Sequence, residues 1–148
     1  ERFKNKEFDL VLVKMNNPED FPNGVRVWSE PLVWVGNLPR LEEYEYIPLV
    51  LSPLPCVYRK SALESLEKAN KKWRIVFTSP SYSVTTAAIK AGMGITALPR
   101  MMVPEGTGII DSTILPCLED THVSLLKHQP DSNIINSFEE FVLKKLRG

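Results

Sequence analysis

The stretch that decides the fold is IVFTSPSYSVTTAAIKAGMGITALPR, which spans residues 75–100. It opens with the apolar run Ile75–Phe77, continues through the polar turn Thr78–Ser81, and then has helical spacing over Val84–Ala91. A glycine ends this helix, and a second short apolar run, Gly94–Leu98, follows before a proline. The pattern predicts a β-α-β unit.

The polar turn of this unit predicts a binding site. Backbone N–H groups at the start of a helix carry partial positive charge and attract anions. Thr78 and Ser79 are therefore candidates for contacts with a ligand, while the structural alternative is that Ser79 or Ser81 only caps the helix. The turn holds no general base, no nucleophile with a partner and no metal ligand. These residues indicate a site that binds a small molecule without reacting with it.

Composition narrows the class of protein. The chain has 148 residues, of which 43% are hydrophobic, and this is enough for a buried core. Its formal net charge of +0 argues against a chain that itself grips nucleic acid, because such chains have a basic face. No run of about 18 apolar residues is present, so we expect no membrane span.

The cysteine and histidine residues indicate neither a disulfide framework nor a metal site. Cys56 and Cys117 are far apart, which fits a reducing cytoplasm. His122 and His128 have no metal-ligand spacing with Cys, Asp or Glu, and no glycine-rich phosphate loop is present. We therefore expect no metal and no cofactor. We also expect no enzyme activity, because the chain offers neither a nucleophile–base pair nor a metal set.

Working outward from the β-α-β unit, apolar runs alternate with helical patterns. This alternation predicts an α/β fold with a largely parallel sheet. Glu1–Glu7 resembles the last turn of a helix, so we expect that residues upstream of it belong to the parent protein. The predicted strands are Phe8–Val13, Pro31–Val35, Ile47–Leu51, Gly108–Ile110 and His122–Lys127, and the predicted helices are Tyr58–Ala69 and a final one that begins at Asp131 or Ser132.

The order of these pieces resembles the effector-binding domain of LysR-type transcriptional regulators. The matching pieces are FDLVLV, WSEPLVWVG, PLVLSPLPCVYRKSALESLEKA and WRIVFTSPSYSVTTAAIKAGMGITALPR, followed by the alternating strand and the closing helix. The resemblance implies a fold like that of type II periplasmic binding proteins, with two Rossmann-like subdomains and a cleft, and with the first subdomain incomplete. Residues 1–14 and 99–148 would belong to regulatory subdomain I, and residues 15–98 would form subdomain II.

The same resemblance implies an effector in the cleft between the subdomains. The lining that it implies is small and mildly polar, with a cation on either side, and this favours a small anionic metabolite. Several of these residues have a structural alternative: a turn glycine at 36, an inert buried thiol at 56, and surface cations at 14 and 59. The candidate effector contacts are Lys14, Gly36, Pro55, Cys56, Arg59, Thr78, Ser79 and Pro99.

The resemblance also implies partners. The effector domain would form a homodimer through the helix Ser61–Ala69 and the strand Ile47–Leu51, and the full-length parent would form a tetramer. DNA would be bound only through an N-terminal winged helix-turn-helix that precedes this chain, in the cytoplasm. Two alternatives stay open: a bilobal solute-binding protein that is not linked to DNA, and a redox sensor of the same family that reacts through Cys56.

Overall fold

The computed structural model describes residues 10–16, 25–127, 140–141 and 144–145. The chain divides into two compact units, which are residues 1–30 with 121–148 (unit 1) and residues 31–120 (unit 2). These units change over at Glu30/Pro31 and Asp120/Thr121, whereas the predicted subdomains change over at 14/15 and 98/99. The predicted subdomain bounds stay a prediction.

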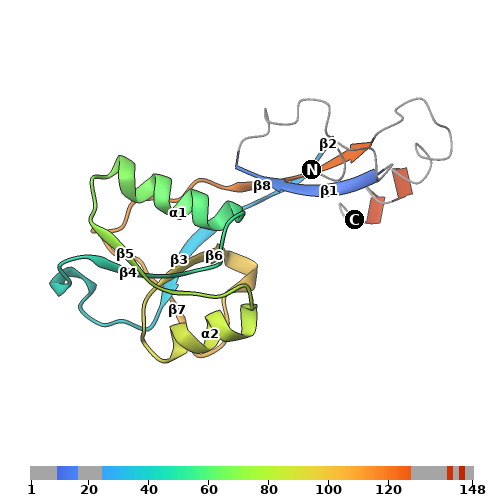
Figure 1. Ribbon diagram of the computed structural model, residues 1–148. Coiled ribbons are helices and arrows are strands. Elements are labelled where there is room, and N and C mark those ends of the chain that lie inside the picture. Colours follow the sequence, from blue (N-terminus) through green and yellow to red (C-terminus); the bar gives the residue numbers. More distant parts are fainter. Residues whose placement is uncertain (1–9, 17–24, 128–139, 142–143, 146–148) are drawn as a thin grey trace. The chain divides into compact units, whose positions relative to one another are not determined.

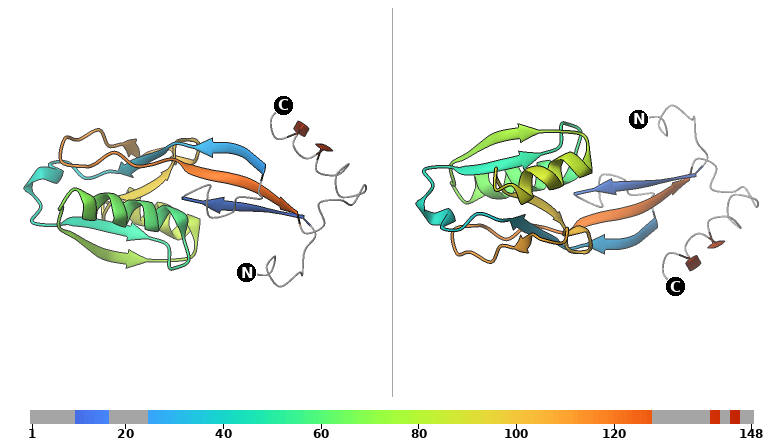
Figure 2. Two further views of the ribbon diagram at one scale, coloured as in Figure 1. Left: turned by 90° about the horizontal axis from the view of Figure 1, so that it is seen from above. Right: turned by 90° about the horizontal axis from the view of Figure 1, so that it is seen from below.

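Unit 1 contains a three-stranded antiparallel sheet. Its strands are β1 (Leu10–Met15), β2 (Val25–Glu30) and β8 (Thr121–Lys127), in the order β1-β8-β2. Figure 2 shows β8 between its two neighbours. Met15 and Val123 are buried, so apolar side chains are shielded from solvent at the end of the sheet where β1 stops.

Unit 2 is built on five strands that join into one sheet. Val50 N–H donates to the Ile95 carbonyl oxygen at 2.8 Å, and Ile95 N–H donates to the Pro48 carbonyl oxygen at 2.9 Å. This bridge joins the β4–β5 pair to the β6–β3–β7 ladder and gives the order β5-β4-β6-β3-β7. The strands are β3 (Leu32–Gly36), β4 (Ile47–Leu51), β5 (Trp73–Thr78), β6 (Thr96–Pro99) and β7 (Gly108–Ile109).

The expectation of a largely parallel sheet is wrong for the part of the chain that the structure describes. Only β4 and β5 form a parallel ladder, extended by the Leu49–Ile95 bridge, while β3 runs antiparallel to β6 and β7. Parallel neighbours need a long crossover connection. Within residues 25–127, helical crossovers connect β4 to β5 and β5 to β6, so parallel pairing is confined to these strands.

Two helices cover opposite faces of the unit 2 sheet, as Figure 1 shows. They are α1 (Val57–Lys68) and α2 (Tyr82–Lys90). Leu66 of α1 packs with Trp34 on one face, and Ile89 of α2 packs with Val33 and Val35 on the other. Because both faces of β3 and β4 are covered, every residue of these strands is buried, as their continuous apolar sequences indicate. Two short 3-10 helices, Leu41–Glu43 and Arg100–Met102, also lie in unit 2.

Most of the predicted elements are confirmed to within a few residues. The strands expected at 31–35, 47–51 and 122–127 and the helix expected at 58–69 are present. The strand expected at 8–13 begins in the described residues at Leu10. Most of the final predicted helix lies outside the described residues. Within it the structure describes 140–141 and 144–145, and these are helical.

One expectation about the surface is wrong. The resemblance implies that the strand Ile47–Leu51 lies on a surface that serves a partner subunit, but all five of its residues are buried, and Leu49 and Val50 are 0% exposed. The strand is paired with β5 on one side and bridged to Ile95 on the other, and the helices cover its faces. β5, rather than β4, carries the more exposed side chains of this pair.

Candidate functional site

The carboxyl ends of β4 and β5 meet at one edge of the unit 2 sheet. Leu51 and Thr78 are partners in the parallel ladder, and Ser79 N–H donates to the Leu51 carbonyl oxygen at 3.3 Å. A short loop leads from β4 into α1 and another leads from β5 into α2. Both helices therefore begin at this edge, and each presents the positive end of its dipole there. We call this region the carboxyl edge.

The loop before α1 is held in place by an arginine. Arg59 donates from Nη1 to the Ser52 carbonyl oxygen at 3.1 Å, which ties the first turn of α1 to the end of β4. The Nε atom of Arg59 is buried and has no hydrogen-bond partner. Cys56 is the N-cap residue of α1, is half-buried, and makes no capping bond through its side chain. Pro55 is exposed beside it.

The loop before α2 uses its serines for local structure. Ser81 is the N-cap residue, and its Oγ accepts a hydrogen bond from Val84 N–H at 3.3 Å. Ser79 is buried, and its Oγ accepts from Ser81 N–H at 3.1 Å. Capping is therefore carried by Ser81, and Thr78 is left as the exposed hydroxyl of the turn. The serines keep their O–H groups as possible donors, since in these bonds they only accept.

Pro99 and Gly36 lie at opposite edges of the sheet. Pro99 ends β6 and is paired with Leu32, and because the chain leading into β6 runs parallel to β4, it lies at the carboxyl edge. Gly36 ends the antiparallel strand β3 and therefore lies at the other edge. A Cβ atom at Gly36 would lie 2.7 Å from Cγ2 of Ile95, so close packing accounts for this glycine. The resemblance implied both residues as effector contacts, and for both this stays a prediction.

Lys14 belongs to unit 1, where it faces a carboxylate that sequence reasoning missed. Its Nζ lies 3.6 Å from Oε1 of Glu30, and the two side chains are 44% and 15% exposed. The apolar pattern of residues 8–13 predicted a strand here. It could not identify Glu30, which lies 16 residues after Lys14, as the partner, because pairing across β8 is set by tertiary structure.

Unit 2 also has a hollow of about 490 Å³ that the sequence did not predict. It lies against β3 and the segment that follows β7, which is fastened by a hydrogen bond of 2.8 Å from Trp34 Nε1 to the Pro116 carbonyl oxygen. Arg100, Asp111 and the exposed Cys117 line it, and none of the predicted effector contacts does. Its walls come from segments about 80 residues apart, so no local pattern could have indicated it.

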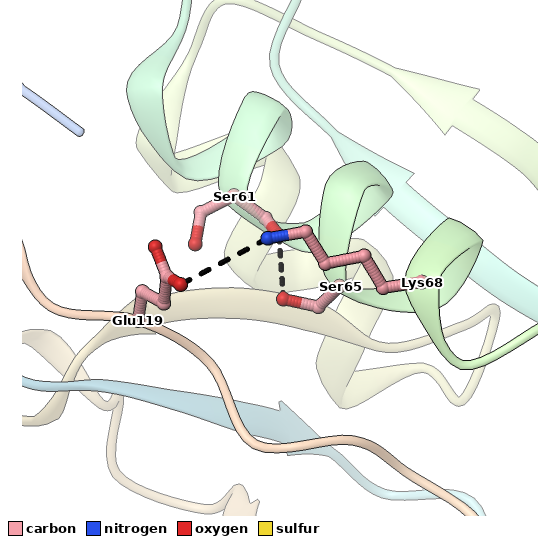
Figure 3. Close-up of polar contacts among 4 residues, drawn as sticks. All are labelled: Ser61, Ser65, Lys68 and Glu119. Carbon is pink, nitrogen blue, oxygen red and sulfur yellow. Dashed lines mark hydrogen bonds and ion pairs between the residues drawn. The ribbon is translucent and has the colours of Figure 1, made fainter. Parts of the chain in front are cut away.

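The side of α1 that carries serines is closed by the chain segment before β8 (Figure 3). Ser61 and Ser65 are buried, and Ser65 Oγ donates to the Ser61 carbonyl oxygen at 2.8 Å. Lys68 Nζ lies 4.0 Å from Oε1 of Glu119, and both side chains are mostly exposed. An exposed ion pair of this kind contributes little to stability, so we assign these residues no part in a site.

Across the described segments, no group of three or more His, Cys, Asp or Glu residues is arranged to hold a metal ion. His122 instead contacts Ser29, with 3.1 Å between Nδ1 and Oγ. Within the same part of the chain, no helix has the length and apolar character that crossing a membrane requires.

Three comparisons place the chain among known proteins. It is 32% identical over 133 residues to the HTH-type transcriptional regulator PecT of Dickeya dadantii, a match that covers 86% of this chain and 40% of PecT. The chain spans about half the length of the curated relatives it matches.

Solved structures share the fold. The CcmR regulatory domain of Synechocystis PCC6803, in complex with 2-PG, has a TM-score of 0.74 at 22% identity, and the match covers 99% of this chain and 77% of that one. The effector binding domain of QuiR, in complex with shikimate, has a TM-score of 0.68 at 16% identity, covering 97% and 74%. The family model of the LysR substrate binding domain matches residues 1–147. The chain therefore belongs to the LysR substrate-binding domain family.

Proposed function

We propose that this chain is the effector-binding regulatory domain of a LysR-type transcriptional regulator, and that the carboxyl edge of unit 2 contacts the effector. One observation supports this most directly: the parallel strands β4 and β5 bring the starts of two helices together with Cys56, Arg59 and Thr78. Pro55, Ser79 and Pro99 lie at the same edge, and Lys14, which belongs to unit 1, stays a predicted contact. Gly36, at the opposite edge, is the weakest of the predicted contacts.

The chemistry of this edge favours a small anionic metabolite. Two helix N-termini and the Arg59 guanidinium attract negative charge, and the Thr78 hydroxyl can donate a hydrogen bond. The edge offers neither a general base next to a nucleophile nor a metal set, so we infer that the domain binds its effector without converting it. The solved CcmR and QuiR domains hold 2-PG and shikimate, which are small molecules.

We further propose that the parent protein binds DNA in the cytoplasm through an N-terminal helix-turn-helix, as expected of a relative of regulators such as PecT. Kinship with these regulators also favours this assignment over a solute receptor. The domain would pair with a second copy through the exposed side of α1, where Lys60 and Glu64 lie, and through the outer strand β5. The parent would assemble further into a tetramer.

A thermal-shift screen tests the effector assignment. The 148-residue chain, and a version extended toward the N-terminus of its parent, are heated with small carboxylates and phosphates that include shikimate and 2-PG. A ligand present at 100 times its Kd stabilises the folded state by about 2.7 kcal/mol, which is easily measured. We expect at least one acid to raise the melting temperature of the extended protein. No shift with any acid in either version would count against an anionic effector.

A further inference from the structure

The Lys14–Glu30 ion pair of unit 1 reaches across the central strand of its sheet. Lys14 is opposite Val123 in the β1–β8 ladder, and Glu30 is opposite Thr121 in the β2–β8 ladder. Directly opposite residues of antiparallel strands point to the same face, and the distance of 3.6 Å between Nζ and Oε1 agrees with this. Lys14, Glu30 and Thr121 therefore share one face at one end of the sheet.

The third member of this group has an unsatisfied hydroxyl. Thr121 is 0% exposed, and its Oγ1 has no hydrogen-bond partner. A buried hydroxyl without a partner destabilises the folded state, and buried polar groups in native proteins are nearly always paired. An unpaired donor on the same face of the sheet as an ammonium group is an arrangement that an anion would complete, because the anion can accept from both.

We propose that Lys14 and Thr121 form an anion-binding site on unit 1, with Glu30 as the carboxylate that occupies Lys14 when no anion is bound. An incoming carboxylate or phosphate oxygen would accept from Lys14 Nζ and Thr121 Oγ1, and the Glu30 side chain would move aside. This inference deepens the proposed function and rests on it, since the site would hold an anionic group of the effector in addition to the contacts proposed at the carboxyl edge. It adds Thr121 and Glu30 to the predicted contact Lys14.

The unpaired Thr121 hydroxyl lowers the stability of the folded state, and its proposed role is to donate a hydrogen bond to the anion. Replacing Thr121 by Val keeps the shape of the side chain and removes the unpaired hydroxyl. We therefore expect Thr121→Val to raise the melting temperature by about 2–4 °C and to weaken anion binding by roughly tenfold. A purely structural threonine would not produce opposite changes in stability and binding.

The test uses inorganic phosphate as the probe, titrated against chloride at constant ionic strength and followed by calorimetry and thermal shift on the 148-residue chain. Thr85→Val is the matched control, because Thr85 is a buried threonine of α2 whose Oγ1 also has no partner. It should raise the melting temperature in the same way and leave phosphate binding unchanged.

The Glu30→Gln variant supplies the second arm. Removing the competing carboxylate should tighten phosphate binding by about threefold to tenfold, whereas Glu119→Gln, which makes the same charge change at an exposed ion pair of unit 2, should not. Lys14→Met should abolish phosphate binding. The proposal is overturned if the wild-type chain does not bind phosphate at 20 mM (on the order of a weak single-anion site), or if Thr121→Val binds it as tightly as wild type.

The phosphate titrations and the metabolite screen distinguish failure of the anion site from failure of the effector assignment. Phosphate binding that depends on Lys14 and Thr121 supports the anion site whatever the metabolite screen finds. A metabolite that binds through Thr78 and is indifferent to Thr121→Val and Glu30→Gln would overturn the anion site and leave the effector assignment standing.

Discussion

Arg59 donates a hydrogen bond from Nη1 to the carbonyl oxygen of Ser52 at 3.1 Å, and this contact closes the loop that carries Pro55 and Cys56 onto the start of α1. The guanidinium is thus a structural group as well as a cation at the carboxyl edge. Its Nε atom, buried without a partner, leaves part of its hydrogen-bonding capacity unused. The proposed effector contact and the shape of the loop therefore depend on the same side chain.

Replacing Arg59 by Met separates these roles. The lost hydrogen bond lowers stability, while the loss of the unpaired Nε raises it, so we expect the free energy of unfolding to change by less than about 1 kcal/mol. Affinity for an anionic effector should fall by about tenfold, because a charge is removed and the loop is released. Lys60→Met, the same charge change at the exposed neighbour, is the control. Wild-type affinity in Arg59→Met, measured by calorimetry, would exclude Arg59 from the site.

The close packing around Gly36 predicts that adding a side chain there lowers stability. A Cβ atom there would lie 2.7 Å from Ile95 Cγ2 and 3.0 Å from Ile110 Cδ1, so we expect Gly36→Ala to lower the free energy of unfolding by about 1–3 kcal/mol. Gly108, its partner in β7, has room: the nearest atom to its Cβ would be 3.9 Å away. Gly108→Ala should change stability by no more than about 0.5 kcal/mol. Equal effects of the two variants in urea unfolding would contradict this account.

The N-cap of α2 provides a test of local structure in the turn. Ser81→Ala removes the acceptor of the 3.3 Å bond from Val84 N–H, and we expect it to cost about 1 kcal/mol of stability. Ser83→Ala, at an exposed position inside the same helix, should leave stability unchanged or raise it by up to about 0.5 kcal/mol, since Ala is the better helix former. If both variants unfold at the same urea concentration, Ser81 is not the cap.

Local patterns predicted the elements of unit 2 well because each depends on neighbouring residues. The apolar runs at 31–35 and 47–51 are covered on both faces and correspond to β3 and β4. The serine-rich turn before α2 was predicted to hold a cap, and Ser81 is that cap. The grouping of Cys56 and Thr78 came from the family resemblance, and the structure brings them to one edge through two parallel strands, each of which leads into a helix.

Strand direction was not predictable in the same way. The residues of β3 do not indicate whether it pairs with β6 in a parallel or an antiparallel way, because strand direction depends on the connections and not on the side-chain pattern. Because β3 runs antiparallel to β6, Gly36 lies at the edge of the sheet opposite the carboxyl edge, and its packing against Ile95 accounts for the glycine.

Long-range polar pairing was equally invisible in the sequence. The Lys14–Glu30 ion pair and the unpaired Thr121 hydroxyl depend on the register of three strands that are separated along the chain. Threonine is common in strands of alternating polarity. Thr121 is unusual only because it is fully buried and its hydroxyl has no hydrogen-bond partner.

The most direct test of the central claim is the Kd of the best-stabilising acid from the screen, measured by calorimetry for the wild type, Thr78→Val and Thr113→Val. Both variants replace an exposed threonine by its isostere, and only Thr78 lies at the carboxyl edge. We predict that Thr78→Val weakens binding by about tenfold, because one hydrogen bond to an anion is lost, and that Thr113→Val binds as the wild type does. Equal affinities for all three proteins would show that the carboxyl edge of unit 2 is not the effector site.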